Sequence, residues 1–414
     1  MAQGYSSYNI ISSEISYKNS PNIDAFGRLR VSNPFTLFDS SHRYSDNGLW
    51  STGAAPGGTA TFNSSQGLVD LGVTAASGSE VIRETVKVFS YQPGKSLFVL
   101  STFVMNTAKT GLRQRVGYFG ADNGYYLEQN NSTVSFVERS SVTGTLVNTP
   151  IAQASWNVDP MDGSGPSGIT LDLTKSQILF MDLEWLGVGT VRIGFVINGN
   201  FYVCHKFHHA NILPYTYITT ASLPLRYEIT NTSATSGVST LKQICSTVLS
   251  EGGYELSGLQ QAVGNPINSP RTLGTAGTFY PVISLRLKTT RLDGIVIPSA
   301  LSAMPISTGN FNWRLIAAGT TTGGSWVSAG TNSCVEYNIS AGTTFTGGRI
   351  LASGFFNASN QGTSQIDISK ESLFKFQLER NGLTSTPFEF TLVIASDSSS
   401  DTVVASLDWE EVTR

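Results

Sequence analysis

Apolar and polar residues alternate along most of the chain with the period of two that is typical of β-strands. The clearest example is residues 96–105, SLFVLSTFVM, and clusters of Gly, Asn, Ser and Pro separate such runs. Further alternating runs are residues 132–138, 178–186, 190–197, 282–288, 311–317, 373–379, 388–395 and 402–410. The apolar spacing of an amphipathic helix is nearly missing. The sequence therefore predicts an all-β protein built from sandwiches or jelly rolls.

The distribution of these runs divides the chain into an N-terminal extended arm and two β-sandwich domains. Residues 1–55 are polar and rich in Tyr and Asn, and we expect them to form the arm. Residues 56–250 are predicted to form a concanavalin-like sandwich, and residues 275–414 a second, jelly-roll-like sandwich. Residues 251–274 between them are rich in Gly, Pro and Ser, as linkers are. Two sandwiches are favoured over one large sheet because strongly twisted sheets rarely grow far before they split.

The composition narrows the class of protein further. Hydrophobic residues make up 40% of the 414 residues, but Asp, Glu, Lys and Arg only 13%, against roughly 25% in an average soluble domain. Such low charge is typical of secreted, cell-surface and virion β proteins. The net charge of −3 and the lack of basic runs argue against a nucleic-acid partner. No run of about 18 apolar residues predicts a membrane span, and residues 1–20 lack the apolar region of a signal peptide. We therefore expect the protein to be made in a cytoplasm and not to be exported by a cleaved signal.

Three cysteines, Cys204, Cys245 and Cys334, are far apart in the chain. A secreted disulfide framework would need more cysteines, and a zinc ribbon would need CxxC pairs. We expect three reduced thiols, with one disulfide between Cys204 and Cys245 as the alternative.

Asn198 and Gly199 stand between two alternating runs, which is a strong signal for a two-residue type I′ hairpin turn. A turn at this position pairs Phe195 with Tyr202. Continued without interruption, the same register pairs Ile193 with Cys204, and Arg192 with His205.

A cluster of candidate zinc ligands follows this turn, formed by Cys204, His205, His208 and His209. Side chains of a strand alternate between its faces, so Cys204 and His208 share one face while His205 and His209 share the other. Residues of each pair lie about 13 Å apart along a strand, too far to share an ion that binds at roughly 2.0–2.3 Å. The sequence therefore predicts no metal site here. A site assembled from His42, His208 and a carboxylate is the alternative.

Asp182 and Glu184 share one face of a predicted strand, with Cα atoms about 6.6–6.8 Å apart. Paired carboxylates can hydrolyse glycosides. In jelly-roll β-glucanases the pattern E-x-D-x-E supplies the nucleophile two residues earlier, where this chain has Phe180. We therefore expect Met181, Leu183 and Trp185 to face the core, with the two carboxylates facing solvent or a partner. The sequence predicts no catalytic residue.

The loop from Asp159 to Gly168 is the remaining candidate for an ion, because its aspartates and glycines could wrap calcium. It lacks the spacing of an EF-hand, and most Asp-Gly loops are turns. P-loop, dinucleotide-binding and Ser/His/Asp motifs are also missing. We expect no cofactor and no enzymatic activity.

Two long segments resemble structural proteins of tailed bacteriophages of the marine and cyanobacterial type. They are residues 22–50, NIDAFGRLRVSNPFTLFDSSHRYSDNGLW, and residues 156–211, which begin WNVDPMDGSGPSG and are followed by LPLRYEI at 223–229. The resemblance covers most of residues 22–254, with the segments in the same order. It implies a virion protein and carries over no catalytic residue. Residues 275–414 resemble a generic virion-type sandwich.

Residues 115–145, RVGYFGADNGYYLEQNNSTVSFVERSSVTGT, resemble a concanavalin-like jelly roll. Folds of this kind often bind sugars through aromatic residues. The resemblance makes Tyr118, Tyr125, Tyr126 and Trp156 candidates for glycan stacking.

Together these observations predict a non-enzymatic virion protein, an accessory of head, neck or tail such as a fibre or decoration protein. We expect it to form a homotrimer, to contact other virion proteins and to dock through its arm. The predicted attachment interface comprises Phe26, Arg28, Arg30, Phe35 and Phe38. Two alternatives are a receptor-binding module for host surface glycans and a polysaccharide-degrading enzyme of the tailspike type.

Overall fold

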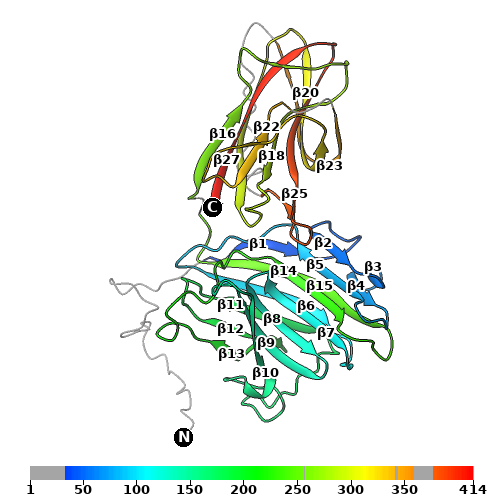
Figure 1. Ribbon diagram of the computed structural model, residues 1–414, viewed down its shortest axis with the longest axis vertical. Coiled ribbons are helices and arrows are strands. Elements are labelled where there is room, and N and C mark those ends of the chain that lie inside the picture. Colours follow the sequence, from blue (N-terminus) through cyan, green and yellow to red (C-terminus); the bar gives the residue numbers. More distant parts are fainter. Residues whose placement is uncertain (1–32, 256, 341–343, 359–375, 414) are drawn as a thin grey trace, which may run out of the picture.

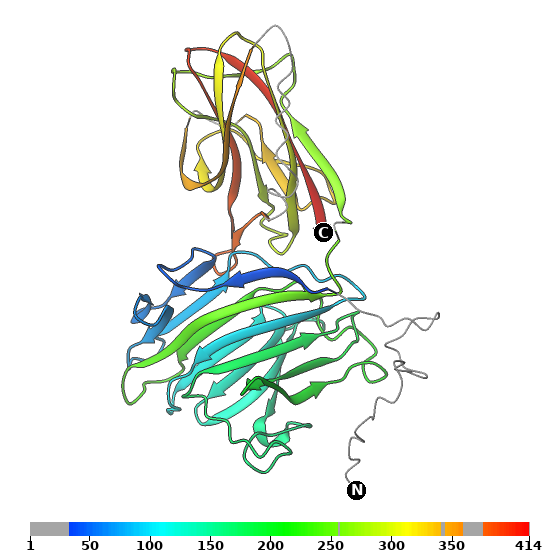
Figure 2. The same ribbon diagram turned by 180° about the vertical axis from the view of Figure 1, so that it is seen from behind.

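The computed structural model describes residues 33–255, 257–340, 344–358 and 376–413, which form two β-sandwiches stacked along the long axis of the molecule (Figures 1 and 2). Strands pair antiparallel throughout these residues, and a single 3₁₀ turn, Gln153–Ser155, is the helical element within them. The prediction of an all-β protein with two sandwiches is confirmed. No helix in the described ranges has the length and apolar character needed to cross a bilayer.

The first sandwich consists of an eight-stranded sheet, sheet I, and a seven-stranded sheet, sheet II. Sheet I has the order β13 (Asn200–Phe207), β12 (Val191–Ile197), β11 (Gln177–Leu183), β6 (Ser96–Val104), β15 (Ser239–Glu251), β4 (Leu68–Val73) and β3 (Gly58–Asn63), with β1 (Phe35–Ser40) also paired to β15. Sheet II has the order β10 (Val147–Ala152), β9 (Thr133–Ser140), β8 (Gly124–Asn130), β7 (Leu112–Phe119), β14 (Leu225–Asn231), β5 (Glu80–Thr85) and β2 (Trp50–Ala54).

Strand β6 shows how the sequence pattern builds the core. Its residues are alternately buried and half-buried, as expected for side chains that point to opposite faces of a sheet. Leu97, Val99 and Phe103 point inward and join the core of the first sandwich. Phe98 and Leu100 therefore point outward, away from sheet II. Because these outward residues are also apolar, β6 contributes apolar side chains to the outer surface of sheet I.

The second sandwich contains a four-stranded sheet, sheet III, and a six-stranded sheet, sheet IV. Sheet III has the order β16 (Leu259–Gly264), β27 (Thr402–Thr413) and β17 (Arg271–Thr272), with β19 (Ile295–Pro305) also paired to β27. Sheet IV has the order β21 (Val327–Ser328), β22 (Val335–Asn338), β18 (Tyr280–Leu287), β26 (Glu389–Ser396), β20 (Asn310–Thr321) and β23 (Phe345–Asn357). A short hairpin, β24 (Arg380–Asn381) and β25 (Thr386–Pro387), leaves this sandwich toward the first one (Figure 1).

The structure moves both predicted domain boundaries. Residues 33–54, assigned from the sequence to the arm, contribute β1 and β2 to the first sandwich. The predicted linker 251–274 contains β16 and β17, which pair with β27 in the second sandwich. These strands are short and lie at sheet edges, so the alternation that marks a strand extends over too few residues to be recognised.

Two of the five predicted attachment residues, Phe35 and Phe38, lie within the described part of the chain. Phe26, Arg28 and Arg30 lie outside the described residues. Phe35 is 37% exposed, whereas Phe38 is buried in the core of the first sandwich. Phe38 is therefore a core residue, which corrects its assignment to the attachment interface.

The two sandwiches meet through the segment that carries the β24–β25 hairpin. The backbone N–H of Arg380 donates to the Val86 carbonyl at 2.7 Å, and the Gln377 side chain donates to the Val88 carbonyl at 3.0 Å. Val88 also packs with Ile295 and Ile297 of β19 in a small apolar cluster between the domains. The contact thus combines backbone hydrogen bonds with apolar burial, which favours a fixed arrangement.

The hairpin of β12 and β13 turns at the predicted residues. Asn198 and Gly199 have φ values of 53° and 78°, as a type I′ turn requires. Phe195 pairs with Tyr202, so the predicted register is confirmed over the first half of the hairpin.

A β-bulge then changes the register of this hairpin. Ile193 pairs with His205 instead of Cys204, and Arg192 pairs with Lys206 instead of His205. The extra residue in β13 keeps the Cys204 side chain in the core while the strand twists. The predicted pairing of Ile193 with Cys204 and of Arg192 with His205 is wrong for this reason.

Candidate functional site

Three phenylalanines from different strands form an aromatic cluster on the outer surface of sheet I. They are Phe98 of β6, Phe180 of β11 and Phe201 of β13. The ring centroids of Phe98 and Phe180 lie 5.9 Å apart, and those of Phe180 and Phe201 lie 5.3 Å apart. Phe98 and Phe201 are separated by 5.8 Å. Phe201 is 58% exposed, so the cluster presents an aromatic surface to solvent.

Gly194 of β12 allows this cluster to form. Strand β12 lies between β11 and β13, and Gly194 pairs with Phe180 on one side. A Cβ atom at this glycine would lie 2.9 Å from Cε1 of Phe180 and 1.9 Å from the Tyr202 carbonyl oxygen. Because glycine has no side chain, the Phe180 ring can lie across β12 and contact Phe201.

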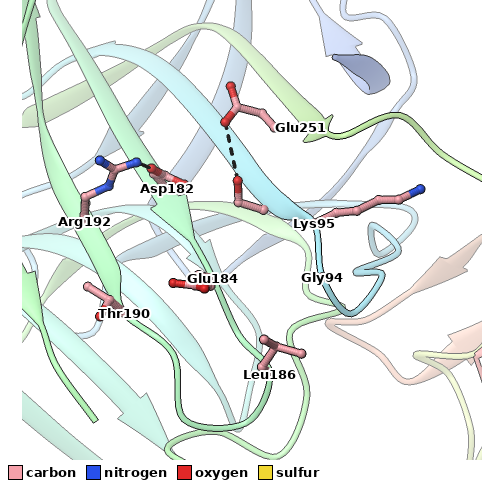
Figure 3. A pocket seen from close by; sticks show the side chains of 9 residues that line it. Gly94, Lys95, Asp182, Glu184, Leu186, Thr190, Arg192 and Glu251 are labelled. Atoms are coloured by element: carbon pink, nitrogen blue, oxygen red, sulfur yellow. Dashed lines mark hydrogen bonds and ion pairs between the residues drawn. The ribbon is translucent and has the colours of Figure 1, made fainter. Parts of the chain in front are cut away.

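A charged depression of about 450 Å³ adjoins the aromatic cluster (Figure 3). Asp182 connects the two features, since it pairs across the sheet with Phe98 on one side and with Arg192 on the other. The depression is lined by Gly94, Lys95, Ser96, Asp182, Glu184, Leu186, Thr190, Arg192 and Glu251. Charged groups of both signs therefore lie beside exposed aromatic carbon.

The ion pair of Asp182 and Arg192 lines one side of this depression (Figure 3). The side chain of Asp182 is 8% exposed, but that of Arg192 is 53% exposed. A guanidinium has five N–H donors, so Arg192 keeps donors that can reach a ligand. On the neighbouring strand pair, the Ser96 hydroxyl donates to Glu251 at 3.4 Å.

Two loops close the depression. In the first, Lys95 donates to Gln92 through both its backbone N–H, at 3.1 Å, and its ammonium group, at 2.9 Å. In the second, the N–H of Glu184 donates to the Thr190 carbonyl at 3.1 Å. The N–H of Leu186 donates to the Tyr91 hydroxyl at 3.1 Å. These bonds fix the backbone of the two loops at the rim of the depression.

The arrangement suits a neutral ligand with many hydroxyl groups. Aromatic faces pack against C–H surfaces, carboxylates accept hydrogen bonds from hydroxyls, and a guanidinium donates to them. Binding sites for small molecules usually combine such an apolar surface with a few polar groups that fix orientation.

Most of the predicted glycan-stacking residues lie in the core instead. Tyr118 and Tyr125 are fully buried, and Trp156 is stacked at 4.1 Å on Phe136. The Tyr118 hydroxyl donates to the Ala221 carbonyl at 2.7 Å. These residues point inward from their segments, so their ring faces pack the sandwich and cannot stack on a sugar in this structure.

Tyr126 differs because it lies on the outer surface of sheet II, where it is nevertheless fully buried. Phe119 packs against its ring at 4.5 Å, and the Arg115 guanidinium lies 4.9 Å from the ring centre. The four tyrosine and tryptophan candidates therefore do not form one site.

The candidate zinc ligands are placed apart, each with its own environment. Cys204 is in the core, where burial raises the pKa of its thiol to about 12. The Nδ1 atom of His205 accepts a hydrogen bond from the Asn157 N–H at 3.2 Å, and burial lowers the pKa of this imidazole to about 4. His208 is exposed. Within the described residues, no group of three or more His, Cys, Asp or Glu side chains could hold a metal ion.

His209 belongs to a buried contact between the two sheets. Its Nε2 atom lies 2.8 Å from Glu138 Oε2, and its Nδ1 atom lies 2.6 Å from the Gly189 carbonyl oxygen. The ring is stacked on Tyr217 at 3.9 Å, and the Tyr125 hydroxyl donates to the same Glu138 oxygen at 2.5 Å. His209 thus connects β9 of sheet II to the loops at the end of sheet I.

The carboxylates of the Asp159–Gly168 loop cap turns of the backbone. Asp159 accepts hydrogen bonds from the N–H groups of Met161 and Ser167, both at 2.9 Å. Asp162 accepts from the N–H of Ser164 at 2.9 Å and from its hydroxyl at 2.6 Å. Both carboxylates thus support turns, which is the role that the sequence favours for this loop.

The sequence interpretation places Asp182 and Glu184 on one outward face, and both line the depression as that interpretation implies. The sequence interpretation does not identify Arg192 or the aromatic cluster as parts of a site. A signal for the cluster is present, because the runs around Phe98 and Phe180 are apolar at consecutive positions and so predict strands with two apolar faces.

No protein-family model and no curated protein matches the chain. Solved structures resemble it at a distance. A protein of unknown function from Shewanella oneidensis MR-1 is 9% identical, with a TM-score of 0.37 over 56% of this chain and 91% of that one. A conserved carbohydrate esterase from the Shiga toxin-encoding bacteriophage phi24B is 11% identical, with a TM-score of 0.31 over 52% and 99%. A Bacillus licheniformis β-glucanase is 11% identical, with a TM-score of 0.32 over 52% and 98%.

These structures correct one expectation from the sequence. The prediction that the chain has no enzymatic activity is contradicted, because proteins of similar fold include a carbohydrate esterase and a β-glucanase.

Proposed function

We propose that this protein binds carbohydrate through the outer surface of sheet I and that it does so as a component of a tailed-bacteriophage virion. The observation that carries the binding proposal is the junction of the aromatic cluster with the charged depression. Phe98 and Asp182 pair directly across β6 and β11, so stacking and hydrogen-bonding groups lie next to each other.

The virion part of the proposal is supported by the resemblance of residues 22–254 to phage structural proteins. Its further elements are a homotrimer, contacts with other virion proteins and attachment through the N-terminal residues. Electron microscopy of intact particles, which gives the location and copy number of the protein, tests these elements directly.

A printed array of bacterial surface polysaccharides and defined β-glucan and xylan oligosaccharides tests carbohydrate binding. We expect the full chain to bind at least one of these probes. Phe201→Ala should weaken that binding at least tenfold, because it removes the most exposed ring of the cluster. Tyr44→Ala is the matched control, since Tyr44 is 83% exposed but belongs neither to the aromatic cluster nor to the lining of the depression. Absence of binding, or equal binding by the Phe201→Ala variant, would refute the proposal.

Hydrolysis of the bound carbohydrate is the second candidate function. It is favoured by one observation, that Asp182 and Glu184 both line the depression where the glycan would lie. Two carboxylates on opposite sides of a glycosidic bond can act as acid and base. In this case Glu184→Gln should abolish release of reducing sugar from the bound probe while leaving binding within about twofold. Unchanged release in this variant would argue against catalysis by this pair.

A further inference from the structure

A second depression, of about 410 Å³, lies on the outer surface of sheet IV in the C-terminal sandwich. It is lined by Gly277, Phe279, Asn310, Phe311, Asn312, Arg314, Phe355, Ala395, Ser396 and Asp397. These residues come from β20, β23, β26, the position after β26 and the segment before β18. None of them lines the depression on sheet I, so the two surfaces are independent.

Phe355 of β23 is the most prominent residue of this depression. Phe355 is 83% exposed, which is a high exposed fraction for a phenylalanine, even on an edge strand such as β23. Asn312 pairs with Phe355 on one side and with Ala395 on the other, so the three residues form one row across the sheet. Ala395 has only a methyl side chain, so it leaves space beside Asn312 on the side of β26.

The strand that carries Phe355 is fixed from below. Gly354 pairs with Trp313, and a Cβ atom at this glycine would lie 2.7 Å from the indole Nε1. The indole therefore packs directly on the backbone of β23. The side-chain amide of Asn312 also donates to the Gly354 carbonyl at 3.2 Å. The exposed ring thus projects from a well-supported backbone.

Polar side chains line the same depression as the Phe355 ring. The Arg314 guanidinium lies 4.0 Å from the ring centre of Phe279 and covers one face of it. The Oδ1 atom of Asn312 has no hydrogen-bond partner among the described residues. Asp397 accepts hydrogen bonds from the N–H of Asn310 at 3.2 Å and from its side-chain amide at 2.6 Å. These hydrogen bonds lower the pKa of Asp397, so it is a carboxylate at neutral pH.

The charges of the depression decide the class of ligand. A strongly anionic ligand would face Asp397, and a strongly cationic ligand would face Arg314. A neutral ligand with hydroxyl groups can use both, because it donates to the carboxylate and accepts from the guanidinium. A pyranose ring also has an apolar C–H face that can pack on the exposed phenylalanine.

We infer that the C-terminal sandwich has its own carbohydrate site, in which Phe355 stacks on one hexopyranose unit while Asn312, Arg314 and Asp397 bind its hydroxyl groups. This site gives the protein a second point of contact with a glycan. The C-terminal site is formed by other residues than the site on sheet I, so each of the two sites can exist without the other.

Saturation-transfer NMR on the full chain tests this inference, with the methyl glycosides of glucose, galactose, mannose and N-acetylglucosamine as probes. The Phe201→Ala variant serves as background, because it removes the ring proposed to bind at sheet I. In this background we expect at least one glycoside to give a signal. Adding Phe355→Ala should reduce that signal at least tenfold. Adding Ile350→Ala should not, since Ile350 is a 52% exposed residue of the same strand outside the depression. Circular dichroism at each step establishes that the variants are folded.

Each outcome separates the two sites. Loss of all signal in Phe201→Ala alone, or an equal signal with and without Phe355→Ala in that background, would overturn the C-terminal site and leave the proposed function standing. A glycoside signal that persists in Phe201→Ala and disappears when Phe355→Ala is added would support the C-terminal site, even if no polysaccharide bound at sheet I. A concentration-dependent dimer that is lost in Phe355→Ala, without any glycoside signal, would assign this surface to a second copy of the chain and overturn the inference.

Discussion

Arg380 of the second sandwich and Glu84 of the first form an ion pair in which Nη1 and Oε1 lie 2.7 Å apart and both side chains are 3% exposed. Glu84 also lies 3.4 Å from Arg226, which in turn lies 2.7 Å from Glu228. The pair at the domain junction thus continues as alternating charges over sheet II. Burial raises the pKa of the Glu84 carboxyl, although Arg380 and Arg226 oppose this shift.

Replacing Arg380 by alanine should destabilise the protein strongly. The substitution leaves Glu84 buried beside one remaining guanidinium, and removal of one partner from a buried ion pair costs about 3–5 kcal/mol. Urea unfolding measures this loss, and calorimetry should resolve two transitions where the wild type has a more coupled one. Lys242→Ala is the control, because its pair with Asp70 is about 30% exposed on both sides and should contribute less than about 1 kcal/mol. An equal loss of unfolding free energy in Arg380→Ala and Lys242→Ala would contradict a buried ion pair between Arg380 and Glu84.

Gly194→Ala should disrupt the aromatic cluster. The added methyl group would meet the Tyr202 carbonyl and the Phe180 ring, and overpacking of this kind costs about 1–3 kcal/mol. Chemical denaturation gives the stability, and binding to the array gives the effect on the site. Gly72→Ala in β4 of the same sheet is the control, because its new methyl would meet only the Thr59 hydroxyl, which can rotate away. A Gly194→Ala variant as stable as Gly72→Ala would show that β12 can shift to make room.

His205 should make the first sandwich sensitive to acid. Burial, with a smaller effect of His208, lowers its pKa from 6.5 to about 4. The unfolded chain therefore binds a proton at a higher pH than the folded one, and stability is lost as the pH falls from about 6.5 toward 4. Between pH 7.5 and 4.5 the wild type should lose on the order of 2 kcal/mol more than His205→Gln. Urea titrations at the two pH values measure both losses, and parallel losses would exclude a contribution from His205.

Native thiol labelling should modify Cys245 far faster than Cys204. Cys245 is exposed and not joined to Cys204 by a disulfide, whereas burial raises the pKa of Cys204 to about 12 and leaves almost no thiolate at neutral pH. Mass spectrometry after brief treatment with iodoacetamide should find the label on Cys245, and Cys245→Ser should abolish it. Labelling of Cys204 at a similar rate without denaturant would contradict its burial.

Local sequence signals predict the parts of this fold that depend on neighbouring residues. The Asn198-Gly199 pair correctly predicts the turn and the pairing of Phe195 with Tyr202, since both follow from the backbone angles of two residues. The register fails at Cys204 because a bulge has no distinct composition. The orientation of Asp182 is also predictable, because it follows from simple alternation along β11.

Contacts between distant segments lie beyond such reasoning. Phe98 and Phe201 are about a hundred residues apart, and only the strand order of sheet I brings them together. Nothing in the sequence distinguishes Arg380 from the other arginines, and its ion pair with Glu84 depends on where the hairpin lies in the folded chain. Alternation also does not reveal that Tyr118 points inward, because β7 is buried on both faces.

The buried ion pair of Arg380 and Glu84 fixes the second sandwich relative to the first. With the hairpin anchored in the first sandwich, the surfaces around Phe201 and Phe355 are held at one separation and one angle. A polysaccharide that engages both would be selected by the distance between its repeating units as well as by their chemistry. Binding at the second surface then occurs at the high effective concentration set by the first, so a weakened junction would lower avidity for long chains and leave affinity for single sugars unchanged.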